Sequence, residues 1–142
     1  MSSYADTSFL VSLYVLDANS ASAAATMKRA VLPLSVTAFG KLELTNAISL
    51  RLFRKELSAS RCRAALALVN EDLVNGVLLN CGLPSSVLER AETLSRKQTP
   101  RLGTRTLDVL HVASALALRA TGFYTFDARQ SALAAAEGLR VR

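Results

Sequence analysis

Short extended segments and longer amphipathic segments alternate along the whole chain. Residues 3–5 form the first extended candidate, and in residues 7–14 the side chains of Phe9, Leu10 and Leu13 recur at a spacing compatible with a helix. This pattern predicts a strand that leads directly into a helix. The same order of strand and helix recurs up to residue 141.

The complete pattern predicts a fold of the α/β class. Strands are predicted at residues 3–5, 33–37, 76–79, 123–126 and 139–141. Helices are predicted at residues 7–14, 20–30, 38–54, 61–72, 84–99, 107–120 and 128–137. Asn19 or Ser20 is expected to cap the second helix and Ser58 the fourth, whereas the fifth helix is expected to end before Pro100. Alternation throughout the chain implies a mostly parallel sheet covered by helices on both faces.

One domain, residues 1–142, accounts for the whole chain. With 142 residues, 51% of them apolar, the chain can form one core but not two ordinary domains. Only six Gly and three Pro occur, and no repeat or flexible linker interrupts the pattern.

Neither a membrane span nor a secretory signal is expected. Asp108, His111 and Arg119 interrupt the richest apolar stretch, so no run approaches the ~18 residues that cross a bilayer. The segment 1–6 has no basic stretch followed by an apolar run. The expected location is the cytoplasm.

Four carboxylates occupy related places in this pattern. Asp6 directly follows the first predicted strand, and Asp127 directly follows the fourth. Glu43 lies about one and a half turns into the helix after the second strand, and Asp108 lies in the first turn of the helix before the fourth. In parallel sheets, ligands bind beyond the carboxyl ends of the strands, where these side chains are expected to meet.

Each acid also has a purely structural interpretation. Asp6 and Asp127 are able to cap the helices that follow them, Asp108 suits a helix N-terminus, and Glu43 suits a solvated helix face. These interpretations weaken when the four are considered together, because all four have apolar neighbours along the chain. Four clustered negative charges repel one another unless a cation is bound among them.

Oxygen ligands without a His or Cys cluster favour a hard cation, Mg²⁺ or Mn²⁺. Such an ion activates water and neutralises the charge on a phosphate, which suits hydrolysis of a phosphodiester. The charge of the whole chain agrees with a nucleic-acid substrate, since it has seventeen Lys and Arg and only eleven Asp and Glu, for a net charge of +6.

Neighbouring polar residues are candidates for supporting roles. Thr7, Ser8 and Thr125 adjoin the acids and are expected to bond to the carboxylates or to water, although helix capping and strand propensity explain them equally well. Asn46 lies one helical turn from Glu43 and either orients it or is structural.

Basic side chains near the last two acids have two open interpretations. Arg101, Arg105 and Arg129 are candidates for contacts with phosphate, or are solvated loop arginines. His111, the only histidine, lies three residues after Asp108 in an apolar helix, so we expect it to form an internal hydrogen bond and not to act as the base.

Other chemistries of α/β proteins fit less well. The dinucleotide motif G-x-G-x-x-G and the phosphate-loop motif G-x-x-x-x-G-K-[ST] are both absent. Asp6-Thr7 suggests an aspartyl-phosphate enzyme, but Ser8 occupies the position where that D-x-D signature requires a second aspartate.

Four segments together resemble the PIN-domain nucleases, in particular the VapC-type toxins of type II toxin-antitoxin systems. The resemblance spans essentially the whole chain. It rests on YADTSFL at residues 4–10, LELTNA at 42–47, and LDVLHVASA at 107–115 followed by TFD at 125–127.

The resemblance implies a three-layer α/β/α sandwich and endonucleolytic cleavage of RNA. It also implies a divalent-metal site built by Asp6, Glu43, Asp108 and Asp127, in which Asp6 and Asp108 are the direct ligands and the other two act directly or through water. A homodimer and an antitoxin protein are implied as partners, with Leu50, Leu52 and Phe53 either contacting the antitoxin or belonging to the core. Two alternatives remain open at this stage, a PIN-type RNA-processing nuclease without an antitoxin and a non-catalytic module that binds RNA or protein.

Overall fold

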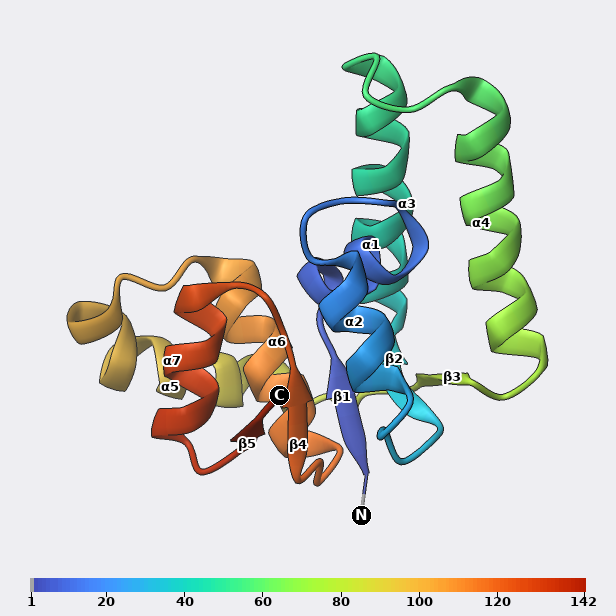
Figure 1. The fold of residues 1–142 in the computed structure, drawn as a ribbon. Helices are drawn as coiled ribbons and strands as arrows, with labels where there is room; N and C mark the ends of the chain where they lie inside the picture. Colours follow the sequence, from blue (N-terminus) through green and yellow to red (C-terminus); the bar gives the residue numbers. More distant parts are fainter. Residues whose placement is uncertain (1) are drawn as a thin grey trace.

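A fully parallel sheet of five strands, in the order β3-β2-β1-β4-β5, forms the centre of this computed structural model, which describes residues 2–142 (Figure 1). The strands are β1 (Ser3–Ala5), β2 (Leu34–Thr37), β3 (Leu78–Cys81), β4 (Gly122–Tyr124) and β5 (Arg140–Val141). The helices are α1 (Thr7–Tyr14), α2 (Ser20–Met27), α3 (Ala38–Phe53), α4 (Ala59–Val74), α5 (Val87–Leu102), α6 (Thr106–Ala117) and α7 (Ala128–Ala136). The predicted α/β class, with helices on both faces of a parallel sheet, is confirmed.

Two hydrophobic cores lie on opposite faces of this sheet. On one face, Leu44 and Ile48 of α3 pack with residues of α1, α2 and α4. On the other face, Val112 of α6 packs with residues of α5 and α7. Successive side chains of β4 point to opposite faces, so Phe123 belongs to the second core and Tyr124 to the first. The three layers are visible in Figure 1, where α3 and α4 form an antiparallel pair that extends beyond the sheet.

Side-chain caps explain where several helices begin. Asp6 caps α1, Thr37 caps α3, Ser58 caps α4 as predicted, and Asp127 caps α7. Each side-chain oxygen accepts a backbone N–H that has no partner within the helix. Three of the four sites lie where a strand or its following loop passes into a helix, so the chain places polar oxygens at the carboxyl edge of the sheet.

The fifth helix does not end before Pro100, and this prediction was wrong. Helix α5 continues to Leu102, and Gly103 ends it in the left-handed conformation at φ 64°, with its N–H donated to the carbonyl of Thr99 at 2.9 Å. Pro100 lies in the last turn, where its missing N–H removes only one bond of the helix. The terminating signal is therefore the glycine.

Several boundaries differ from the predicted ones. Strand β3 begins at Leu78 instead of residue 76, because Gly76 lies in a turn at φ 74°. Helices α2 and α6 end three residues earlier than predicted, at Met27 and Ala117. Strand β4 is also earlier, ending at Tyr124, so that a two-residue connection leads to Asp127. No helix in the described part of the chain has the length and hydropathy required to span a membrane.

Candidate metal and active site

A cavity of about 500 Å³ opens at the carboxyl edge of the sheet, and we call it the site cavity. Its walls include three of the predicted acids, Glu43, Asp108 and Asp127. The fourth, Asp6, is fully buried and bonded to Ser8, which also lines the cavity. The site lies where strand order reverses, since β1 and β4 are neighbours although they are far apart in sequence.

Asp6 is held by the start of its own helix and by the loop after β4. Its Oδ1 accepts from the Phe9 N–H at 2.9 Å and the Ser8 hydroxyl at 2.7 Å, and its Oδ2 accepts from the Thr125 hydroxyl. Burial raises the pKa of Asp6, against the opposing effect of these hydrogen bonds. The capping interpretation of Asp6 is therefore correct. The same carboxyl group is also buried in surroundings that compensate its negative charge poorly.

Glu43 is connected to the core through His111. Its Oε1 accepts from the Thr7 hydroxyl and from His111 Nε2 at 2.7 Å, and His111 Nδ1 is 2.8 Å from the Tyr4 hydroxyl. Burial opposes the charge on Glu43, but the bonds from His111 and Thr7 outweigh it and lower its pKa. The structure thus excludes a solvated helix face for Glu43.

The prediction that His111 forms an internal hydrogen bond is confirmed, although its partner is one of the acids. The imidazole is fully buried, and the first turn of α3 approaches it closely, since a Cβ on Gly40 would lie 3.6 Å from the His111 ring and 3.0 Å from the Thr37 hydroxyl. Burial raises the pKa of Tyr4, so its hydroxyl stays protonated and is available to donate to Nδ1. This leaves the Nε2 proton for Glu43.

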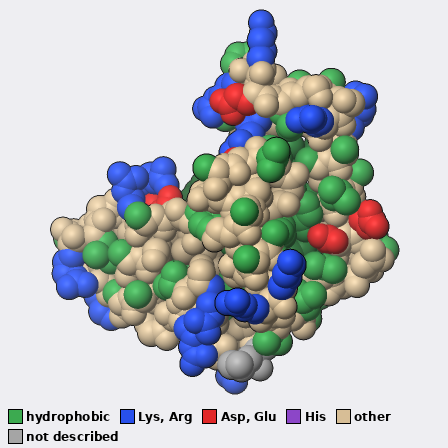
Figure 2. All heavy atoms as spheres, in the orientation of Figure 1, with side chains coloured by type: hydrophobic (Ala, Val, Ile, Leu, Met, Phe, Trp, Pro, Cys, Tyr) green, Lys and Arg blue, Asp and Glu red, His purple; other side chains and the backbone are tan. Residues whose placement is uncertain are grey.

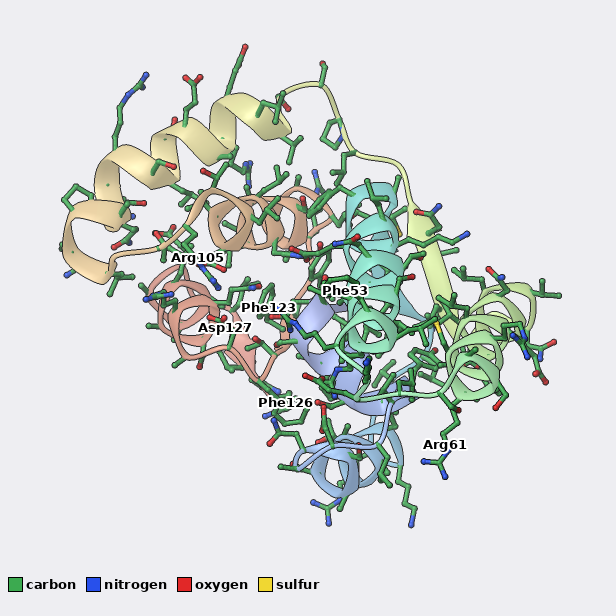
Figure 3. All side chains as sticks on the ribbon, turned by 90° about the horizontal axis from the view of Figure 1, so that it is seen from above. Phe53, Arg61, Arg105, Phe123, Phe126 and Asp127 are labelled. Carbon is green, nitrogen blue, oxygen red and sulfur yellow. The ribbon has the colours of Figure 1, made fainter. Side chains whose placement is uncertain are left out.

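Arg105 joins the two remaining acids. Its guanidinium donates to both oxygens of Asp108, at 3.1 and 3.2 Å, and to Asp127 Oδ2 at 3.1 Å. Figure 3 labels Arg105 and Asp127, which lie close to each other. Burial opposes the charge of Asp108, but the bonds and charge of Arg105, with a bond from Gln130, lower its pKa. The pKa of Arg105 is raised by Asp108, with further contributions from Asp127 and Glu43.

A hard cation fits the chemistry of this donor set. Among residues 2–142, no three Asp, Glu, His or Cys side chains converge closely enough to hold a metal in the present arrangement. A guanidinium instead supplies the positive charge between Asp108 and Asp127, and the side chain of Arg105 is 62% exposed, so it is free to turn outward. One further oxygen donor is buried at the cavity, the Gln130 Oε1, which has no hydrogen-bond partner in the described structure.

The other predicted residues fall into two groups. Thr7, Ser8 and Thr125 contact the acids directly, and Ser8 also accepts the N–H of Phe126 at 2.9 Å. Asn46 is exposed and lines a separate apolar cavity beside Glu43, and no hydrogen bond joins these two residues in the described structure.

Of the three predicted arginines, only Arg105 lines the site cavity. Arg101 instead donates to Gln98 at the end of α5. Two arginines not predicted from the sequence also line the cavity, Arg51 on α3 and Arg54, the residue that follows α3. Their separation from Glu43 by eight and eleven residues is a helical spacing that places all three on one side of the helix, and this signal was available in the sequence.

Sequence reasoning also missed Gln130, Tyr4 and the link from His111 to Glu43. Gln130 follows Asp127 by three residues, which is the spacing of a capping box. The structure uses this glutamine differently, because its Nε2 donates to Asp108 Oδ1 at 3.3 Å. No local signal reveals that contact, since the two residues belong to different helices.

The PIN domain family model matches residues 3–136, and the chain therefore belongs to the PIN domain family. Comparison with curated proteins yields no match.

Two solved structures resemble the fold. VapC20 of Mycobacterium tuberculosis, described as a sarcin-ricin loop cleaving toxin, has a TM-score of 0.73 and 19% sequence identity, covering 92% of this chain and 94% of that chain. PAE2754 of Pyrobaculum aerophilum has a TM-score of 0.62 and 16% identity, covering 99% of this chain and 83% of that chain. These likenesses support the PIN-like three-layer α/β/α fold.

Proposed function

We propose that this protein is a divalent-metal-dependent endoribonuclease and the toxin of a type II toxin-antitoxin pair. The observation that carries the proposal is the site cavity itself, whose walls bring Glu43, Asp108 and Asp127, beside the buried Asp6, together with Arg51 and Arg54. Membership of the PIN domain family and the fold shared with an RNA-cleaving toxin support it.

The four acids would hold Mg²⁺ or Mn²⁺, with Asp6 and Asp108 as direct ligands and Glu43 and Asp127 acting directly or through water. When bound, the ion would supply an activated water and neutralise charge on the scissile phosphate. His111 and Thr7 hold Oε1 of Glu43, so its Oε2 remains for the site. Arg105, once turned from the acids, together with Arg51 and Arg54, would attract the phosphates of RNA.

Cleavage of a total-RNA pool tests this function. The purified protein should produce discrete fragments with Mg²⁺ or Mn²⁺ and none with a chelator. A folded protein that binds RNA without cleaving it, across several metals and substrates, would instead identify a non-catalytic binding module.

Replacing His111 with Phe should slow cleavage by about 10–100-fold, the usual cost of removing a group that orients a metal-site carboxylate. It should also destabilise the fold by about 1–3 kcal/mol, because the Tyr4 hydroxyl loses its buried partner. Initial cleavage rates and urea denaturation measure the two effects. The Tyr4→Phe variant is the matched control, since it leaves the His111 bond to Glu43 in place and should lose less activity. Wild-type rates in a folded His111→Phe variant would exclude this role.

An antitoxin is the proposed protein partner, and helix α3 is its proposed contact. Phe53 is 81% exposed, and Leu50 and Leu52 are partly exposed on the same helix, which also lines the site cavity (Figure 3). A homodimer and a cytoplasmic location belong to the same proposal. Co-purification from the native operon should recover the antitoxin with wild-type protein and less of it with Phe53→Asp. Recovery of no partner would favour an RNA-processing nuclease, and sedimentation would report the oligomeric state.

A further inference from the structure

Gln130 is a buried polar side chain, and only one of its two amide atoms has a hydrogen-bond partner in the described structure. The residue is 6% exposed and lines the site cavity with Asp108 and Asp127. Its Nε2 donates to Asp108 Oδ1 at 3.3 Å, whereas its Oε1 is buried and accepts no hydrogen bond in the described structure. A buried acceptor without a donor costs about 1–3 kcal/mol, so its retention calls for an explanation.

Rotating the amide does not remove the problem. The oxygens of the Asp108 carboxylate, which also accept from Arg105, only accept hydrogen bonds. The NH₂ group of Gln130 therefore has to face Asp108, which leaves Oε1 as the unpaired atom. With the amide reversed, Oε1 of Gln130 would face the carboxylate oxygens of Asp108 and repel them.

The missing donor does not come from the neighbouring protein groups. The guanidinium of Arg105 is directed to Asp108 and Asp127, and the N–H of Gln130 itself is donated to Asp127 Oδ1 at 2.9 Å. A donor that enters the cavity from outside is required. Divalent cations such as Mg²⁺ retain several waters when bound by carboxylates, and these waters donate strongly.

We propose that Gln130 is a positioning residue of the cation site, whose Nε2 orients Asp108 and whose Oε1 accepts a hydrogen bond from water carried by the bound cation. This role rests on the proposed function. It gives the unpaired oxygen a partner only in the cation-bound protein, so the site gains a bond when the ion enters.

The test compares Mn²⁺ affinity with the stability of the metal-free protein. Gln130→Met keeps the length of the side chain and removes both polar atoms. Gln130→Asn keeps both polar atoms on a shorter side chain, so they no longer reach their present positions. Calorimetric titration with Mn²⁺ should show about a 10-fold or greater loss of affinity in each. Urea denaturation without metal should show Gln130→Met to be as stable as the wild type or more so, because the unpaired oxygen is gone.

Gln98 offers a matched control. It is another buried glutamine, 3% exposed, but both of its amide groups have partners, Glu137 and Arg101, and it does not line the site cavity. Gln98→Met should therefore lose stability and keep its Mn²⁺ affinity, the reverse of the result for Gln130→Met.

Wild-type Mn²⁺ affinity in the folded Gln130→Met or Gln130→Asn variant would overturn the role of Gln130 alone. If the KM for RNA is raised in the same variant, the unpaired oxygen is assigned to a ribose hydroxyl instead. If wild-type protein shows no saturable Mn²⁺ binding, the proposed function fails together with this role, so the two failures are distinguishable.

Discussion

Asp108→Asn should slow metal-dependent RNA cleavage by at least about 10³-fold, equivalent to about 4 kcal/mol in the barrier, while the protein remains folded. The Asp108 carboxyl group is already ionised and so contributes a negative charge. Partial desolvation opposes that charge, but Arg105 and Gln130 lower the pKa of Asp108. In the wild-type protein the backbone N–H of Arg105 donates to Asp108 Oδ2 at 2.8 Å. The amide oxygen of Asn is able to accept the same N–H, so the start of α6 is preserved. The charge that a cation requires is lost.

The measurement is the initial rate on a defined RNA at saturating Mn²⁺, with circular dichroism to verify folding. Asp72→Asn is the matched control, since Asp72 lies on α4 away from the site cavity and accepts the Tyr14 hydroxyl at 2.6 Å. It should cleave at the wild-type rate even if it loses some stability. Equal rates for wild type and a folded Asp108→Asn variant would show that the reaction does not depend on this carboxylate.

Mn²⁺ should stabilise the wild-type protein by about 2.7 kcal/mol at a free concentration of about 100 times its Kd, and Asp6→Asn should remove this stabilisation. The metal-free Asp6→Asn variant should be at least as stable as the wild type at neutral pH. The reason is that Asp6 is fully buried, and burial raises its pKa. Ionising Asp6 in the folded protein therefore costs stability when no cation is present.

The direction of the pH dependence follows from that raised pKa. The stability associated with neutral Asp6 is fully present below the ordinary pKa of aspartate, and it is lost as pH rises through the raised pKa of the folded state. Asn is neutral at every pH and is an equally good helix cap, so it keeps this stability. The advantage of Asp6→Asn over the wild type should grow from acidic to neutral pH.

Urea denaturation across this pH range, with and without Mn²⁺, measures both effects. Asp72→Asn again serves as the control and should retain the full response to Mn²⁺. A metal-free Asp6→Asn variant that is less stable than the wild type at neutral pH would contradict the unfavourable burial of this charge. Full Mn²⁺ stabilisation of the same variant would remove Asp6 from the ligand set.

Protein groups already bind the oxygens of the acids. Arg105 lies between Asp108 and Asp127, while Glu43 accepts hydrogen bonds from Thr7 and His111. Figure 2 shows that Lys and Arg side chains are distributed around much of the visible surface, with acids less frequent. In a chain of net charge +6, the four acids are thus gathered at the carboxyl edge of the sheet, with arginines beside them.

Local sequence determined the elements of this fold and the position of each acid relative to them. The spacing of Phe9, Leu10 and Leu13 predicted α1, and the short run before Asp127 predicted β4, because periodicity depends only on neighbouring residues. Parallel strands align their carboxyl ends, so the meeting of Asp6 and Asp127 at one edge also followed from the sequence. The sequence determined the ends of the elements less well. Helix α5 continues past Pro100, because one missing hydrogen bond does not outweigh the packing of a helix.

Only the tertiary structure decided which partners the acids have. His111 reaches Glu43 across 68 positions, and Thr125 reaches Asp6 across 119, because the strand order β3-β2-β1-β4-β5 places their elements side by side. The contact of Gln130 with Asp108 depends likewise on the packing of α7 against α6. Hydrogen bonds of this kind depend on distances between separate elements, and neither periodicity nor spacing along one element carries that information.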